Sequence, residues 1–593
     1  MKSRNNIDEK FKWNLKDIYE NDELLYEAVA KIKEKIKSIP QFKGKLKYPK
    51  KCLELFKLED EIDLEFANIS VYSLLKKAED VASQKYTEME VVVGNLANFY
   101  AESSVFVEPE LNGMSEKYLK KLISDPNFKN YAFGLKLILR NKPHILSEKE
   151  EKILTKASKF ADDFSDIFSN IDNVDLKFKD AVDSKGKKHL LTNATFSALR
   201  ESKDRTLRKS ASLNMLEGFK SLSNTIATNY IGNLKSDWFY SEIRNHKSTL
   251  SASLFSINMD ESVYRKLINH VHSNIPILQK YYKIRKKLLN LNQLWVYDLS
   301  VPLTKYAPSI QFLDGVEMVK KALSVMGEDY IKIVQRSINE RWVDVYPAEN
   351  KESGAFNCGG AYSVHPYVLM NYVNNIDGVF TFAHEIGHSV HSYLSNKNQP
   401  HNLSHYPIVL AEIASTVNEV ILLKYLYANA KTKEEKIHFL DEYIRMFTST
   451  IFTQTKFSEF EEYAHKLIEN DEPISKEILN NYYQSLNMMC EGKLVKTFNE
   501  SCYAWMRIPH FYNSFYVFKY ATGMISAISI VKNILDEKPN SKENYFKMLK
   551  GGGSDYPLNL LNNAGIDLSS DNPYQDAFSE LKWAINELEK LVK

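Results

Sequence analysis

The stretch His384-Glu385-Ile386-Gly387-His388 is an H-E-x-x-H pentad, and no other part of the chain says more about its chemistry. On a helix, residues four apart share one face, so both imidazoles of the pentad can reach a single metal ion. The glutamate between them is the usual proton acceptor for a metal-bound water in zinc peptidases. The pentad therefore predicts a catalytic zinc site on a helix.

The residues around the pentad predict one amphipathic helix. Asp377-Gly378 is expected to cap its N-terminus, and the helix is expected to run through about Tyr393. Its histidines fall beside the apolar stripe and not on it, so core packing is not the reason for their presence. The stripe recurs at steps of three and four residues and consists of Val379, Ala383, Ile386, Val390 and Tyr393.

A catalytic zinc needs a third protein ligand and an open position for water. Glu412 is the first candidate, because it lies in a second predicted helix, residues 411–419, whose apolar and small neighbours leave a carboxylate in need of a partner. Glu419 is seven residues further along the same face, and we expect it to accept a hydrogen bond from a ligating imidazole. His401 and His405 lie in a polar stretch interpreted as a loop, and they are the alternative third ligands.

Most of the chain has the residue pattern of helices. Apolar-periodic segments run from about residue 22 to 169 and from 196 to 291, and helices dominate again from 407 to the C-terminus. Between the first two segments, the turn signal Asp183-Ser184-Lys185-Gly186 predicts a β-hairpin near residues 174–192. The predicted fold class is therefore mostly α-helical.

A non-helical zone lies just before the pentad. Residues 342–346 and 367–372 read as short strands, which predicts a small β-sheet beside the H-E-x-x-H helix. The glycine-bearing loop at 354–360 is expected to let another backbone approach closely. An extended peptide is therefore expected to add as a strand to this edge, formed by the loop and the strand at 367–372. The substrate-binding candidates here are Gly360 and His365, although Pro366 makes a purely structural turn at His365 an equal alternative.

Composition excludes several classes of function. The 593 residues are 44% hydrophobic and carry a net charge of +2, which is typical of a globular protein and gives no support for binding nucleic acid or an anionic membrane. No apolar run approaches the length needed to cross a bilayer. The N-terminus leads into charged residues, and the four cysteines form no C-x-x-C pair, which favours a cytoplasmic protein with reduced thiols. The sequence predicts no oligomeric state.

Motifs spread over nearly the whole chain give it a family resemblance. It resembles the thimet-oligopeptidase family of zinc peptidases in residues 382–392, 411–419, 507–512 and 515–523. Supporting matches occur at 353–356 with 365–367, at 552–557, at 13–19 and at 202–205.

The resemblance implies a fold and a set of site residues. The fold is a two-lobed helical zincin-type body, with one zinc ion at the floor of a deep channel that admits oligopeptides but not folded proteins. The implied metal ligands are His384, His388 and Glu412, and the implied general base is Glu385. We expect residues 1–195 to form much of one channel wall and residues 196–593 to form the catalytic region.

A C-terminal segment supplies candidates for stabilising the oxyanion. His510 and one or more nearby tyrosines are expected to donate hydrogen bonds to the tetrahedral oxyanion, each typically worth about 3 kcal/mol. Phe518 stands where the family usually carries a tyrosine, so the choice of hydroxyl is left open. The candidate tyrosines are Tyr512, Tyr516 and Tyr520, of which Tyr512 is also a substrate-binding candidate.

These observations predict a cytoplasmic zinc endopeptidase that hydrolyses internal bonds of short unstructured oligopeptides, with the metal-bound water activated by Glu385. The first alternative is a metallo-exopeptidase, of carboxypeptidase or dipeptidyl type, in which Arg341 or Arg507 holds a substrate carboxylate. The second is a non-catalytic peptide-binding protein with a structural zinc. A structural site commonly has four protein ligands, often cysteines, whereas only three ligands are visible here.

Overall fold

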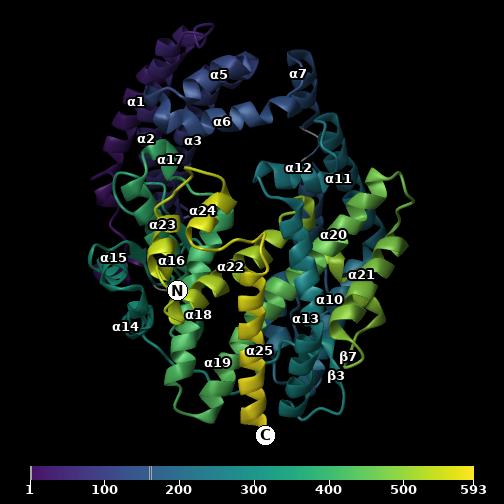
Figure 1. Cartoon of the computed structure of the whole chain (residues 1–593). Helices are drawn as coiled ribbons and strands as arrows, with labels where there is room; N and C mark the ends of the chain where they lie inside the picture. Colours follow the sequence, from purple (N-terminus) through teal and green to yellow (C-terminus); the bar gives the residue numbers. More distant parts are fainter. Residues whose placement is uncertain (1–2, 159–160, 162) are drawn as a thin grey trace. The chain divides into compact units, whose positions relative to one another are not determined.

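The computed structural model describes residues 3–158, 161 and 163–593, and the described chain is mostly helical, as predicted (Figure 1). None of the helices in these residues combines the length and apolar character that crossing a membrane requires.

The strands are β1 (Ala181–Val182), β2 (Lys188–His189), β3 (Leu294–Trp295), β4 (Val343–Asp344), β5 (Phe356–Cys358), β6 (Tyr367–Leu369) and β7 (Val495–Lys496). The α-helices are α1 (Asp22–Ile36), α2 (Pro49–Glu79), α3 (Gln84–Ser104), α4 (Val107–Gly113), α5 (Glu116–Ile123), α6 (Ala132–Asn141), α7 (Glu148–Ala157), α8 (Asp163–Asn170), α9 (Asn193–Glu201), α10 (Arg205–Ser221), α11 (Ser223–Ile243), α12 (Thr249–Ser256), α13 (Glu261–Leu288), α14 (Phe312–Leu323), α15 (Glu328–Asn339), α16 (Ile376–Asn398), α17 (His401–Ser404), α18 (Ile408–Asn429), α19 (Lys433–Met446), α20 (Thr453–Glu469), α21 (Lys476–Glu491), α22 (Phe518–Leu535), α23 (Ser541–Leu549), α24 (Pro557–Asn563) and α25 (Asn572–Val592).

The chain forms two compact units, each assembled from three separate segments. The predicted division into residues 1–195 and 196–593 follows the order of the sequence, and it stays a prediction about the roles of those regions. Unit 1 consists of Met1–Pro143, Ala307–Tyr425 and Ile530–Ile566, and unit 2 consists of His144–Tyr306, Leu426–Ser529 and Asp567–Lys593.

Unit 1 contains the small sheet predicted beside the H-E-x-x-H helix. Its strand order is β4-β6-β5, with β4 parallel and β5 antiparallel to β6, and both β5 and β6 contact α16. The segment predicted as a glycine loop therefore contains a strand, β5. Because β6 is paired on both sides, the edge on that side of the sheet is β5, which lies in the predicted glycine-bearing segment 354–360, and the strand at 367–372 leaves no free edge for a peptide.

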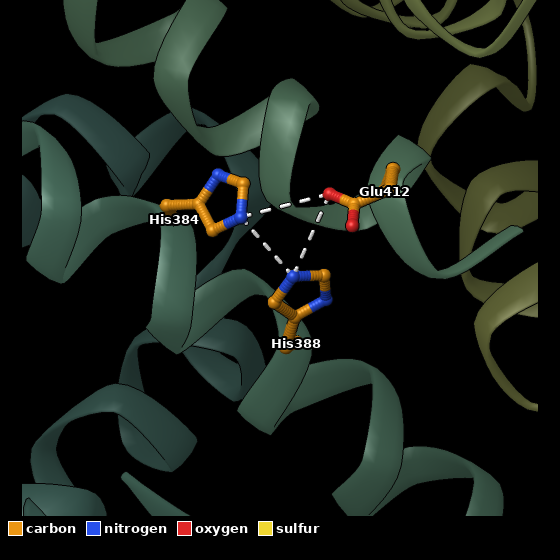
Figure 2. A group of neighbouring side chains, drawn as sticks. All are labelled: His384, His388 and Glu412. Carbon is orange, nitrogen blue, oxygen red and sulfur yellow. Dashed lines mark hydrogen bonds and ion pairs between the residues drawn. The ribbon is translucent and has the colours of Figure 1, made fainter. Parts of the chain in front are cut away.

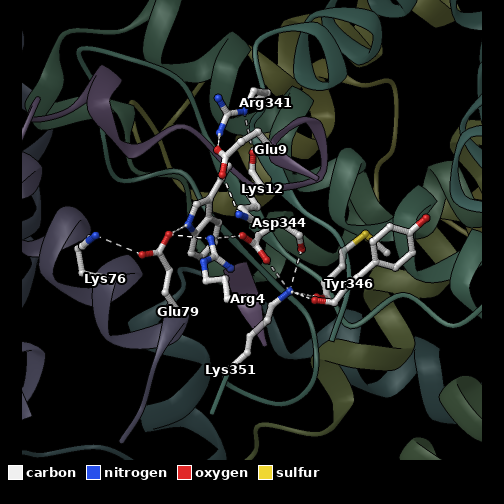
Figure 3. Close-up of polar contacts among 11 residues, drawn as sticks. Arg4, Glu9, Lys12, Lys76, Glu79, Arg341, Asp344, Tyr346 and Lys351 are labelled. Carbon is white, nitrogen blue, oxygen red and sulfur yellow. Dashed lines mark hydrogen bonds and ion pairs between the residues drawn. The ribbon is translucent and has the colours of Figure 1, made fainter. Parts of the chain in front are cut away.

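A cluster of charged side chains ties the N-terminal segment to this sheet (Figure 3). Arg4 forms ion pairs with Glu79 of α2 and with Asp344 of β4. Lys351 Nζ lies 2.6 Å from Asp344 Oδ1 and also donates to the carbonyl of Tyr346 at 2.8 Å. The side chains of Asp344 and Lys351 are at most 1% exposed, so their ion pair offsets part of the cost of burying both groups. The cluster therefore fixes residues from three parts of the chain around β4.

The β-hairpin predicted near residues 174–192 is present in unit 2. β1 pairs with β2 in antiparallel register, with Ala181 opposite His189. Asp183 Oδ1 accepts hydrogen bonds from the backbone N–H groups of Lys185 and Lys187, both at 2.9 Å. A short aspartate side chain that satisfies its own turn in this way is a strong local signal, which is why the sequence identified the hairpin.

Candidate metal centre

The H-E-x-x-H pentad lies in α16, whose ends differ from the predicted ones. The helix begins at Ile376, because Asn375 Oδ1 accepts a hydrogen bond from the N–H of Gly378 at 2.9 Å and caps it. It continues to Asn398, beyond the end predicted near Tyr393. Of the predicted core face, Val379, Ala383, Ile386 and Val390 have no measurable exposure, whereas Tyr393 is only partly buried.

Helix α18 lies directly against α16. A Cβ atom on Gly387 would lie 2.7 Å from the carbonyl oxygen of Ala414, so the two helix backbones meet at a point where only glycine fits. Asn418 Nδ2 donates to the carbonyl of Ala383 at 3.0 Å, and its Oδ1 accepts from the hydroxyl of Tyr330 at 2.7 Å. These contacts fix the two helices in register and bring the carboxylates of α18 to the histidines of α16.

Replacing Gly387 by alanine is expected to push α18 away from α16 and to lower kcat/KM by about 100-fold, because a displacement of about 1 Å at a reacting centre has an effect of that order. The measurement is peptide hydrolysis together with metal affinity. Gly94→Ala in α3 is the matched control, since a Cβ there meets nothing within 4 Å. Equal activity in the two variants would contradict this account of the helix contact.

Three donor atoms from the two helices converge in unit 1 (Figure 2). The Nε2 atoms of His384 and His388 are 3.2 Å apart, and Glu412 Oε2 lies 3.6 Å from the first and 3.8 Å from the second. Donors bound tetrahedrally to zinc at about 2.0–2.2 Å are separated by about 3.3–3.6 Å, so the arrangement fits one such ion. Within the described part of the chain, these three residues form the one group of histidine, cysteine and acidic side chains compact enough to share a metal.

Both histidines also have hydrogen-bond partners outside the donor set. His384 Nδ1 lies 3.1 Å from Glu419 Oε1, the arrangement that the seven-residue spacing of the two glutamates predicts. The side chain of His388 forms a hydrogen bond with the backbone of Ala411. Such partners orient an imidazole and keep its remaining nitrogen directed at the metal position.

Burial and neighbouring charges set the protonation of the site. Burial raises the pKa of the Glu385 carboxyl to about 7, although the positive charge of His384 opposes the change. Burial also lowers the pKa of His388 to about 3, so this imidazole is neutral and able to ligate. For His384 burial acts downward, but the hydrogen bond and negative charge of Glu419 outweigh it and raise the pKa to about 9, so this imidazole must release its proton when it binds a metal. Glu385 is thus buried beside the donor set with a pKa suited to exchanging a proton near neutral pH.

A cavity of about 490 Å³ opens over these residues. Both histidines, Glu385 and Glu412 line it, together with the segment around β5 and Gly360. β5 is held there because Asn357 Nδ2 donates to Ser389 Oγ of α16 at 2.6 Å. The edge strand of the sheet therefore borders the same cavity as the candidate metal ligands.

The remaining histidines near the pentad occupy other positions. His401 belongs to the short helix α17, not to the loop that the sequence suggested, and its ring lies 5.3 Å from Tyr362. His405 lines the cavity but is not part of the compact donor group. His365, predicted to contact substrate, is buried: its ring stacks on Trp342 at 4.9 Å, and its Nε2 lies 3.1 Å from Asp17 Oδ2. These contacts favour the structural alternative for His365.

The predicted oxyanion residues lie in unit 2. The hydroxyl of Tyr520 is 3.3 Å from His510 Nε2, and the Tyr516 ring lies 5.2 Å from that of Tyr520. Tyr512 is directed elsewhere, since it stacks on Phe168 at 4.7 Å, and burial raises its pKa to about 12. Phe518 is fully buried against Tyr264. His510, Tyr516 and Tyr520 therefore form one cluster. The hydroxyl of Tyr512 instead accepts a hydrogen bond from Asn229 Nδ2 at 3.2 Å.

Sequence reasoning assigned no role to Asn418 or Gly387, although both position the site. A signal for each was available. Asn418 is an amide in the apolar stretch of α18, and a buried amide needs hydrogen-bond partners. Gly387 is a glycine in the interior of a helix, where its cost of about 1 kcal/mol indicates a close packing contact.

Comparisons with known proteins give matches that cover nearly the whole chain. The family model described as Peptidase family M3 matches residues 198–580, and the model described as Oligopeptidase F matches residues 110–178. The chain is 38% identical to the oligoendopeptidase F homolog of Borreliella burgdorferi, over 100% of both chains. It resembles the crystal structure of oligoendopeptidase-F from Enterococcus faecium with a TM-score of 0.73 and 30% identity, covering 96% of this chain and 99% of that one. A crystal structure from Chlamydophila abortus matches with a TM-score of 0.94 and 33% identity over 100% of both chains.

Proposed function

The chain belongs to peptidase family M3, a family of metalloendopeptidases, and on this premise we propose that it is a zinc-dependent enzyme hydrolysing internal bonds of short unstructured oligopeptides. The observation that carries the proposal is the convergence of His384, His388 and Glu412 beside the buried Glu385.

The donor set supports one zinc ion as the cofactor. Two imidazoles and one carboxylate are a ligand set of catalytic zinc sites, and they leave a position for water or substrate. When bound, zinc would lower the pKa of its water to about 7 and polarise the scissile carbonyl. Each ligand is supported by a neighbour: Glu419 orients His384, the backbone of Ala411 orients His388, and Ser415 Oγ donates to Glu412 Oε2 at 3.2 Å.

Glu385 is proposed as the general base. It accepts a proton from the attacking water and delivers it to the leaving amine. A carboxyl with a pKa near 7 is suited to both steps at neutral pH, because it can hold or release the proton with little cost. His510, Tyr516 and Tyr520 are proposed to donate hydrogen bonds to the oxyanion, and the contact between Tyr520 and His510 would hold these two side chains together for that role.

The substrate is proposed to bind as an additional strand on β5. The edge position of β5 and its place beside the donor set support this, because backbone pairing there would align a peptide with the metal. Backbone hydrogen bonds do not depend on side-chain identity, so broad specificity follows. Gly360 lines the same cavity and leaves room for the peptide backbone. The channel implied by the family resemblance, with residues 1–195 in its wall, would select substrates by their length.

A cytoplasmic location is proposed with the same function. All four cysteines are unpaired thiols: Cys52, Cys358, Cys490 and Cys502. Unpaired thiols are typical of a reducing compartment. The near-balanced charge of the chain gives no support for a nucleic acid or a membrane surface as the partner. Small peptides are therefore proposed as the partner.

Cleavage of peptides blocked at both termini tests the proposal. With a length series of N-acetylated, C-amidated peptides, we expect internal cleavage of short members and none of a folded protein, with products identified by mass spectrometry. Blocked termini remove the groups that an exopeptidase must recognise, so cleavage only of the unblocked series would contradict endopeptidase activity. Of the arginines considered for an exopeptidase, Arg341 is already engaged, donating to Glu9 and to the carbonyl of Lys12.

A further inference from the structure

A second cavity, of about 470 Å³, lies entirely within unit 2. Residues of α9, α13, α19, α20 and α21 line it, together with the 3₁₀ segment η12 (Asn499–Arg507). Cationic side chains outnumber carboxylates in its wall, which contains Arg200, Arg445, Lys456 and Arg507 against Glu442 and Glu491. Since burial raises the pKa of Glu491 to about 7, the wall has an excess of positive charge.

Two of these cations have partners within the protein. Arg445 forms ion pairs with Glu201 at 2.9 Å and with Glu442 at 3.1 Å. Lys456 donates to Asn487 Oδ1 at 2.8 Å. The excess charge is therefore concentrated on the remaining pair, Arg200 and Arg507.

Arg200 and Arg507 pack on the same aromatic ring. Their guanidinium carbons lie 5.4 Å and 4.9 Å from the ring centroid of Phe196. Arg200 Nε is buried and has no hydrogen-bond partner within the described chain. Burial, with the positive charge of Arg507 added, lowers the pKa of Arg200 to about 10, and burial also lowers the pKa of Arg507. Both guanidinium groups therefore lie over one ring, and the positive charge of Arg507 disfavours that of Arg200.

Two carboxylates act electrostatically on this pair, and each also bonds to another residue. Asp172, which acts on Arg507, accepts a hydrogen bond from Asn193 Nδ2 at 3.0 Å. Glu201, which acts on Arg200, is the partner of Arg445. An acceptor for Arg200 Nε must therefore come from outside these contacts.

Aromatic and aliphatic residues also line this cavity, and Lys456 Nζ lies over two of the rings, 5.2 Å from the centroid of Tyr483 and 5.8 Å from that of Phe457. Tyr483 and Phe457 both line it, with ring centroids 6.4 Å apart and planes 23° from parallel. Leu278 and Ile508 extend this apolar surface. A concave site of a few hundred cubic ångströms with apolar walls and a few convergent polar groups is typical of small-molecule binding.

We propose that this cavity binds a small organic anion, with its phosphate or carboxylate group between Arg200 and Arg507 and its apolar part against Tyr483 and Phe457. Guanidinium groups present forked N–H donors that match both anions, and a bound anion gives the unpartnered Nε of Arg200 an acceptor. The charge of the anion also offsets the repulsion between the two arginines. No residue used in this argument belongs to the candidate metal centre.

Calorimetric titration of the full-length protein tests the proposal with three probes that share one ring: phenyl phosphate, benzoate and phenol. We expect at least one anion to bind at least tenfold more tightly than phenol, and the stronger anion identifies the preferred head group. Arg200→Gln and Arg507→Gln should each weaken that binding at least tenfold. Lys235→Gln, at an exposed position of α11, makes the same change in net charge and should leave binding unaltered.

Several outcomes would overturn the proposal. If phenol binds as tightly as the anions, the cavity is an apolar site without preference for anions. If neither anion binds, the proposal that the cavity binds an organic anion is rejected. Undiminished binding in the Arg200→Gln, Arg507→Gln double variant would place the anion elsewhere, including at the metal centre. Circular dichroism checks that each variant folds. If Arg200→Gln does not fold, Arg200→Lys replaces it, because lysine keeps the charge but loses Nε and the fork, and unaltered binding by that variant would likewise reject the site. The readout is binding and not hydrolysis, so failure here leaves the peptidase proposal untouched.

Discussion

Glu385→Gln is expected to retain a full complement of metal and to lose kcat/KM by about 10⁴-fold on a doubly blocked peptide, the upper range for removing a general base. Glutamine keeps the size and hydrogen-bonding reach of the side chain but cannot accept a proton from the attacking water. The donor atoms of His384, His388 and Glu412 are untouched, so metal binding should persist. Metal content by atomic absorption and initial rates on one peptide are the two measurements.

The control for this variant is another glutamate of unit 1 that is far from any ligand. Glu328→Gln makes the same chemical change at a side chain that is 93% exposed at the start of α15, and it should behave as the wild type does. A Glu385→Gln enzyme with near wild-type turnover would reject the base assignment. Loss of metal in that variant would instead indicate that Glu385 supports the ligands.

The ligand set was accessible from the sequence because it depends on local periodicity. A four-residue spacing on a helix places His384 and His388 together whatever surrounds them. The seven-residue spacing of Glu412 and Glu419 similarly gives them one face, and both reach the histidines in the structure. The spacing of residues along the chain does not predict the distance between the two helices. That distance is set by the backbone contact at Gly387.

Features that depend on contacts between distant segments were missed. β5 is a three-residue strand that begins only two residues after Gly354, and it exists because it pairs with β6 and is anchored to α16. His365 looked available in the sequence, but its partners Asp17 and Trp342 lie in other segments. Local sequence patterns also do not predict that each unit is assembled from three separate segments, because a single boundary along the chain cannot describe such a unit.

Replacing Glu412 by alanine is expected to abolish stoichiometric metal binding and, with it, peptide hydrolysis. The remaining imidazoles would hold the ion by two bonds, with no carboxylate to offset its charge. Zinc affinity by competition with a chelator measures the effect, and the loss should exceed that of Glu419→Ala. Glu419 contacts only His384 Nδ1, and removing such a supporting partner typically costs about 10–100-fold in metal affinity.

The comparison of the two glutamate variants distinguishes a ligand from a supporting residue. If Glu412→Ala kept stoichiometric metal, the third ligand would be His405, which lines the same cavity, or His401 on the adjacent α17. If both variants lost metal equally, Glu419 would have to bind the ion directly, which its position on the far nitrogen of His384 argues against. This geometry predicts a severe loss of metal binding for the variant at residue 412 and a moderate loss for the variant at residue 419. The carboxylate of Glu412 lies within 3.8 Å of both Nε2 atoms, whereas that of Glu419 acts on the metal only through an imidazole.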